Sequence, residues 1–126
     1  MCNEEIKVSS LNKTWILDLD GTIVKHNGYL IDGVDTLLPD IEKFLSQMND
    51  NDFVVIVTAR RIEYREQTEQ FLREHNIRYD AIIWNTPNGE RILVNDIKPN
   101  GLHTAIAINT VRNEACKMKF IIDDNL

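Results

Sequence analysis

The residues best suited to chemistry are Asp18 and Asp20, which stand one residue apart at the end of the first strongly apolar run of the chain. Gly21 follows them and permits the chain to curl back after a strand, so the two carboxylates can converge on one point. Converging carboxylates repel each other unless a cation or a shared proton intervenes, and Mg²⁺ suits such oxygen ligands. One carboxylate could then attack a phosphorus atom while the other protonates the leaving oxygen and activates water. The alternative is a surface turn without function, because Asp-x-Asp alone is a weak signal.

Polar groups also end two later apolar runs: Thr58 follows residues 53–57, and Asp96 follows residues 91–94. If the strands are parallel, these groups meet Asp18 at one edge of the sheet, where ligands bind in open α/β sheets. The Thr58 hydroxyl there suits a phosphate oxygen, although it could also cap the following helix. Asp96 would complete a Mg²⁺ shell with Asp18 and the backbone carbonyl of Asp20.

Such an acidic site demands a cation near a phosphorylated substrate, and the chain offers four candidates: Lys25, Arg60, Arg91 and Lys98. A second apolar run that ends in acids, residues 120–122 before Asp123 and Asp124, competes with Asp96 for the metal. It lies after the last expected strand, so Asp96 is favoured. Asp123 and Asp124 are interpreted as a solvated tail.

A sheet must bring these groups together, and the chain alternates strand-like and helix-like segments. Strands are expected at residues 14–19, 53–57, 81–84, 91–94 and 104–108, and helices at residues 39–48 and 62–75. This alternation predicts a parallel sheet with right-handed crossovers. Residues 1–12 are polar and are expected to lead in loosely.

A flap is expected beside the two acids. Asn27-Gly28 is the strongest short hairpin signal in the chain, because both positions of the usual turn must accept positive φ. It predicts a small hairpin over residues 22–31 that projects over Asp18. Lys25 would then lie near a bound ligand.

The composition indicates one domain over residues 1–126, with 43% hydrophobic residues to form its core. A net charge of −6 argues against nucleic-acid and anionic-membrane partners, which need basic surface. The first residues lack the basic and apolar regions of a signal peptide, and no apolar run approaches membrane-spanning length, so a cytoplasmic location is expected. Cys2 and Cys116 have no metal-ligand spacing and are interpreted as reduced bystander thiols.

Three segments resemble motifs I, II and IV of the haloacid dehalogenase-like (HAD) superfamily, in this order: Asp18-Leu19-Asp20-Gly21-Thr22, Thr58-Ala59-Arg60 and Asn95-Asp96. The resemblance covers about residues 14–110. Within the superfamily, the chain is similar to small bacterial proteins found among capsule and surface-polysaccharide functions. These carry a similar Gly-x-Arg segment that runs into Asn-Asp-x-Lys-Pro.

The resemblance implies a three-layer α/β/α sandwich with a mainly parallel, Rossmann-like sheet and no cap domain. Asp18 would be the nucleophile that forms an aspartyl-phosphate, Asp20 the general acid and base, Thr58 the ligand of the phosphoryl group and Asp96 a Mg²⁺ ligand. The residues expected to bind substrate are Gly21, Lys25, Ala59, Arg60 and Lys98. The usual motif III lysine has no clear match, since Thr86 occupies a plausible position for it. Arg91 or Lys98 is proposed instead.

These expectations describe a Mg²⁺-dependent phosphatase that acts on a small phosphorylated substrate. A phosphorylated sugar or sugar-acid is expected by analogy with the subgroup. Because a capless site is open, either the flap or a second copy in a homo-oligomer would cover it. Two alternatives stay open: phosphoryl transfer to an acceptor other than water, and a non-catalytic phosphate-binding or partner-binding module.

Overall fold

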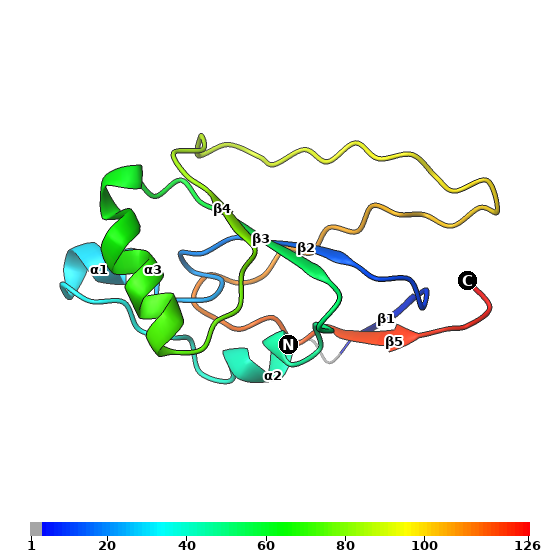
Figure 1. Ribbon diagram of the computed structural model, residues 1–126, viewed down its shortest axis with the longest axis horizontal. Helices are drawn as coiled ribbons and strands as arrows, with labels where there is room; N and C mark the ends of the chain where they lie inside the picture. The colour runs from blue at the N-terminus through cyan, green and yellow to red at the C-terminus, as the bar shows by residue number, and fades with distance from the viewer. Residues whose placement is uncertain (1–3) are drawn as a thin grey trace.

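The chain forms two small parallel sheets, seen in a computed structural model that describes residues 4–126 (Figure 1). The strands are β1 (Glu5–Val8), β2 (Thr14–Leu17), β3 (Phe53–Val57), β4 (Ala81–Ile83) and β5 (Lys119–Ile122). The helices are α1 (Gly28–Ile31), α2 (Ile41–Leu45) and α3 (Arg65–Glu74), and the 3₁₀ turn η1 (Ile62–Tyr64) precedes α3. β1 pairs with β5, and the second sheet has the order β2-β3-β4.

The three-stranded sheet is built from continuous apolar runs, the pattern of strands buried in parallel sheets. β3 lies in its centre, with Ile56 opposite Leu17 of β2 and Ile82 of β4. All three strands run in the same direction, so their carboxyl ends lie at one edge of the sheet. The prediction of an α/β fold with parallel strands is therefore confirmed.

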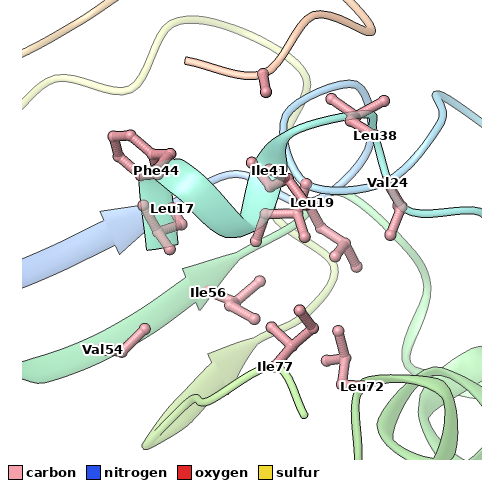
Figure 2. Close-up of a cluster of buried hydrophobic side chains, with 12 residues drawn as sticks. Leu17, Leu19, Val24, Leu38, Ile41, Phe44, Val54, Ile56, Leu72 and Ile77 are labelled. Atoms are coloured by element: carbon pink, nitrogen blue, oxygen red, sulfur yellow. The ribbon is translucent and has the colours of Figure 1, made fainter. Parts of the chain in front are cut away.

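The core lies on one face of this sheet. Figure 2 shows side chains of β2, β3, α2 and α3 converging there: Leu17, Ile41, Phe44, Val54, Ile56 and Leu72. Side chains alternate along a strand, and on the other face Ile16, Phe53 and Ile83 are 54%, 48% and 51% exposed. A three-layer sandwich would bury these residues under a second layer of helices. That finer prediction is not confirmed.

The helix predicted at residues 62–75 is confirmed as η1 and α3. The helix predicted at residues 39–48 is shorter, because α2 ends at Leu45. In the part of the chain that the structure describes, no helix is both long and apolar enough to cross a membrane.

The predicted hairpin over residues 22–31 is wrong. Asn27 has the positive φ of 55° that its turn requires, but Gly28 begins the helical turn α1 instead of the second half of a hairpin. The Asp32 N–H closes that turn on the Gly28 carbonyl at 2.7 Å. The chain returns to the body through Val24, which bridges Asp20 on one side and Leu37 on the other.

The predicted strands at residues 91–94 and 104–108 are also wrong. Figure 1 shows the segment between β4 and β5 running to the opposite end of the molecule and back, without forming a ladder. Ile92 and Val94 are 85% and 88% exposed. The outgoing and returning arms of this segment meet at Thr104. Its hydroxyl accepts a hydrogen bond from Asn95 Nδ2 and donates one to the Asp96 carbonyl, both at 2.6 Å. A strand needs a neighbouring backbone as partner, and here a side chain takes that place.

Phe120, near the start of β5, joins the two sheets through aromatic contacts. Phe120 lies edge-on to Trp15 of β2, with ring centroids 5.0 Å apart, and Phe44 of α2 lies 5.9 Å from Trp15. Residues 5–8, which were expected to form a loose lead-in, form β1 and pair in parallel with β5. The run at 120–122 is therefore a structural strand.

Asp52 fixes the start of β3 from a buried position. Its carboxylate accepts hydrogen bonds from the Lys13 N–H at 2.9 Å, the Trp15 indole N–H at 2.8 Å and the Asn49 N–H at 2.9 Å. Burial acts to raise the pKa of Asp52, but these hydrogen bonds outweigh burial and lower the pKa below its ordinary value of 3.8.

Asp52→Asn is expected to lower the free energy of unfolding at neutral pH by about 1–3 kcal/mol, because the amide cannot accept all three hydrogen bonds. A depressed folded-state pKa stabilises the protein above the unfolded-state pKa, and this contribution is lost as pH falls through the folded value. Urea unfolding should therefore show a wild-type advantage at neutral pH that shrinks below pH 3.8. Asp50→Asn, at an exposed neighbour, is the control and should change little.

Candidate functional site

A cleft of about 710 Å³ opens at the carboxyl ends of β2 and β3. Its lining comes from five segments of the chain: residues 18–22, 26–29, 58–60, 88–91 and 110–112. Both acids after β2 and the hydroxyl after β3 belong to it. The parallel register brings these groups together. Leu17, the last residue of β2, lies opposite Ile56, the last but one of β3.

The turn after β2 follows Asp18, whose side chain lines the cleft. Gly21 has a φ of 84°, and the N–H groups of Thr22, Ile23 and Val24 all approach the Leu19 carbonyl at 3.0–3.2 Å. The chain thus curls immediately after the strand, as the glycine predicts.

The two oxygens of Asp18 have different partners. Oδ2 accepts a hydrogen bond from the Thr22 hydroxyl at 2.9 Å, and Oδ1 lies 2.9 Å from Nη1 of Arg91. The Asp18 side chain is 38% exposed, so a ligand in the cleft can reach it. A carboxylate that is both accessible and oriented by two donors is suited to attack an electrophile.

Asp20 lies in a different environment, because a buried arginine holds it. Arg60 Nη2 and Nε lie 2.8 and 3.3 Å from the two Asp20 oxygens. The other N–H groups of Arg60 reach Asp35 at 2.9 and 3.0 Å and the Thr68 hydroxyl at 2.9 Å. The Tyr29 ring covers the guanidinium, with its centroid 3.8 Å from Cζ. All five N–H groups of Arg60 are therefore engaged within the protein.

These contacts fix the protonation of the network. Burial acts to lower the pKa of Arg60, but its hydrogen bonds to Asp35 and Asp20 outweigh burial and raise that pKa. Burial, and next the charge of Asp20, raise the pKa of Tyr29, so the Tyr29 hydroxyl keeps its proton. The Arg60 side chain is fully buried, which makes it a support for Asp20 and leaves it no donor for a substrate.

Thr58 lies at the end of β3 and is 1% exposed. Its hydroxyl oxygen accepts the Arg60 N–H at 3.0 Å, so the hydroxyl proton can be donated to a ligand oxygen in the cleft. The next helical element begins only at Ile62, with Arg61 at its N-cap and no side-chain cap. Thr58 therefore does not cap that helix.

Of the candidate cations, Arg91 is the one that the structure brings to Asp18. Its other guanidinium nitrogen, Nη2, lies 3.4 Å from the Thr86 hydroxyl. Lys25 instead pairs with Asp32 at 2.9 Å and does not line the cleft. Lys98 lies in an exposed turn that its own N–H closes on the Leu102 carbonyl at 2.9 Å. Gly21 and Ala59 do line the cleft.

The structure does not bring Asp96 to the cleft. It is exposed in the arm that runs away from β4, because the strand expected to carry it to the sheet edge is not formed. Asp123 and Asp124 follow β5 in the other sheet, where the Asp123 N–H donates to the Val8 carbonyl at 2.8 Å. Within residues 4–126, no group of three or more His, Cys, Asp or Glu side chains is arranged to hold a metal ion. The donors at the cleft do not fit the Mg²⁺ site expected from Asp18 and Asp96.

Sequence reasoning missed several residues of this site. Asp35 and Thr68 complete the shell of Arg60, but neither belongs to a local pattern that would indicate this role. Arg112 lines the cleft from a segment expected to lie beyond the last strand, so no strand-end argument could have found it. Asn113 beside it has a φ of 69°, and asparagine is among the residues that tolerate such a turn.

Comparison with known proteins gives one solved structure and no family. No protein-family model matches the chain, and no curated protein matches it. A chain in the structure described as "Structure of Pnkp1/Rnl/Hen1 complex" is 32% identical over 68% of this chain, with a TM-score of 0.46. This chain spans 32% of the length of that one. A similarity of this size and coverage assigns neither a fold nor an activity.

The comparison nevertheless contradicts the family predicted from the sequence motifs. The solved structure that is similar to this chain belongs to the Pnkp1/Rnl/Hen1 complex, and not to a haloacid dehalogenase-like protein of the capsule group. The predicted membership is therefore wrong, although short stretches such as Asp18 to Thr22 resemble that family's motifs. Roles for these residues have to come from their geometry.

Proposed function

We propose that this protein hydrolyses phosphomonoesters, with Asp18 as nucleophile and Asp20 as general base and acid. The observation that carries the proposal is the pairing of an accessible Asp18 carboxylate, 2.9 Å from Arg91, with a second acid that Arg60 holds in the same cleft. Arg91 and the Thr58 hydroxyl are the donors available to phosphate oxygens. The expectation of a phosphorylated sugar rested on the family resemblance alone. The substrate class that we propose is therefore a small phosphomonoester.

In the first step, an Asp18 oxygen attacks phosphorus, the bond from phosphorus to the ester oxygen breaks, and the leaving oxygen takes a proton from Asp20. In the second step, Asp20 takes a proton from water, the water oxygen attacks the aspartyl-phosphate, and inorganic phosphate leaves Asp18. Arg60 donates to both Asp20 oxygens, which fixes the position of this carboxylate in the cleft for both proton transfers. The proton gained there is the one given to the leaving oxygen of the next substrate.

A non-catalytic phosphate-binding module is a second candidate. It is favoured by the Arg91 guanidinium that already pairs with Oδ1 of Asp18, and by Asp96 not lining the cleft. Transfer to an acceptor other than water uses the same first step. Adding a short alcohol and identifying the phosphorylated product separates transfer from hydrolysis.

Phosphate release from a panel of small phosphomonoesters tests the proposal. Asp18→Asn is expected to abolish release, and Asp20→Asn to reduce it by about 10²- to 10⁴-fold. With a substrate whose leaving group needs no proton, such as p-nitrophenyl phosphate, Asp20→Asn slows mainly the second step, and intact mass spectrometry should detect a phosphoryl adduct on that variant. Asp50→Asn is the control. An Asp18→Asn protein as active as wild type would eliminate covalent catalysis, and an inactive wild type that still binds phosphate would favour the binding module.

Arg60→Ala is expected to lower the free energy of unfolding by about 3–5 kcal/mol, because it leaves two carboxylates without their buried partner. Arg60→Lys should recover only part of this loss, since an ammonium cannot form the fork that reaches Asp20 and Asp35 together. Urea unfolding measures both variants. Arg65→Ala, which breaks an exposed pair with Glu69, is the matched control and should cost less than about 1 kcal/mol. Equal effects of Arg60→Ala and Arg65→Ala would contradict the structural role of Arg60.

The magnesium requirement predicted from the sequence has its own test, because the mechanism above does not depend on it. Phosphate release is expected to be insensitive to EDTA, because the donors at the cleft do not fit the predicted Mg²⁺ site and Arg91 lies where it can neutralise the phosphate charge. Loss of release on adding EDTA that Mg²⁺ restores would contradict this expectation and support the predicted metal site.

A further inference from the structure

Resting on the proposed function, we propose that Arg112 binds a second anionic group of the substrate, so that the preferred substrate is a phosphomonoester that also carries a phosphate or a carboxylate. Arg112 lies at the cleft, on the segment that returns toward β5.

The backbone beside Arg112 is tied to the turn that carries the two acids. The Asn113 N–H donates to the Gly21 carbonyl at 2.9 Å, and the Asn113 side-chain oxygen accepts the His26 N–H at 2.7 Å. The Glu114 N–H closes a turn on the Val111 carbonyl at 3.0 Å. Arg112 is therefore held in a fixed place relative to Asp18, even though its segment has no helix or strand.

The stem of Arg112 lies against Gly21. A Cβ built on Gly21 would stand 3.2 Å from Arg112 Cγ, so the glycine provides the space that this side chain occupies. Gly21 thus serves both the curl after β2 and the approach of Arg112.

The unengaged donors of Arg112 distinguish it from the other two arginines of the cleft. Arg60 spends all its donors on the protein, and Arg91 pairs with Asp18 at 2.9 Å. In the part of the chain that the structure describes, the Arg112 guanidinium forms no ion pair and no hydrogen bond with the protein. A guanidinium presents a planar fork of donors that matches phosphate and carboxylate, and here the fork is open to a ligand.

The size of the cleft supports a substrate with a second group. A volume of about 710 Å³ lies in the range of pockets for whole small molecules and exceeds what a single phosphate fills. With the reacting phosphate at Asp18 and Arg91, Arg112 can contact a group on the remainder of the substrate. This contact would form equally in the bound and reacting states, so it should act mainly on KM.

Three probes that share a two-carbon backbone test the proposal: ethyl phosphate, phosphoglycolate and ethylene glycol bisphosphate. Wild type should show higher kcat/KM for the two probes that carry a second anionic group. Arg112→Gln should lower the ratio of kcat/KM for these probes to that for ethyl phosphate by about ten- to hundredfold, mainly through KM. Arg112→Lys should lose less. The probe with the larger loss shows whether phosphate or carboxylate is preferred.

Arg73→Gln, which removes an exposed charge on α3 outside the cleft, is the matched control and should leave the ratio unchanged. Calorimetric binding of the same probes to the Asp18→Asn protein, which needs no turnover, separates the two proposals. Weaker binding of the two probes with a second anionic group on adding Arg112→Gln would support the role of Arg112 even in a protein without activity. An equal effect on all three probes, or none, would overturn it.

Discussion

The buried guanidinium of Arg60 is the interaction on which the site depends. It joins the turn after β2, the segment before α2 and the α3 helix through Asp20, Asp35 and Thr68. Removing ions from water is costly, and only a geometry in which every donor has an acceptor repays that cost. This network meets the condition, since no buried side-chain nitrogen or oxygen in the described part of the chain lacks a hydrogen-bond partner. The same contacts that close the core therefore set the position of Asp20.

Asp18 and Asp20, separated by one residue, both line the cleft but have different environments, because Arg60 covers much of Asp20 and leaves Asp18 more accessible. The Asp18 side chain is 38% exposed, whereas that of Asp20 is 13% exposed. A reaction that needs a nucleophile and a proton carrier benefits from this difference, since a single environment could not favour both roles. The turn at Gly21 makes the separation possible within three residues.

The sequence predicted the parts of the fold whose signal is local. The apolar run of β3 and the helix at residues 62–75 formed as expected, and so did the curl at Gly21. The prediction of a strand at residues 91–94 was wrong, because an apolar pattern shows that a segment can be extended, but not that another strand will pair with it. Arg91 still reaches Asp18, by a path that the predicted strand did not describe.

The residues that could not be predicted are those whose roles arise from contacts distant in sequence. Asp35 has no distinguishing neighbour until the folded chain places it beside Arg60. Arg112 depends in the same way on Asn113 reaching back to Gly21. The motif around Asp18 was more informative about local geometry than about family, because a short acidic turn can be shared without a shared ancestry.

The pairing of β1 with β5 has a consequence for how the protein is made. Residues 5–8 align with residues 119–122, so a ribosome must release nearly all of this sequence before the pair can close. Until β5 has been synthesised, β1 has no strand to pair with on the nascent polypeptide. Trp15 likewise lacks its contact with Phe120. Closing so long a loop is slow compared with forming α3, and the interval exposes apolar surface to chaperones or to aggregation.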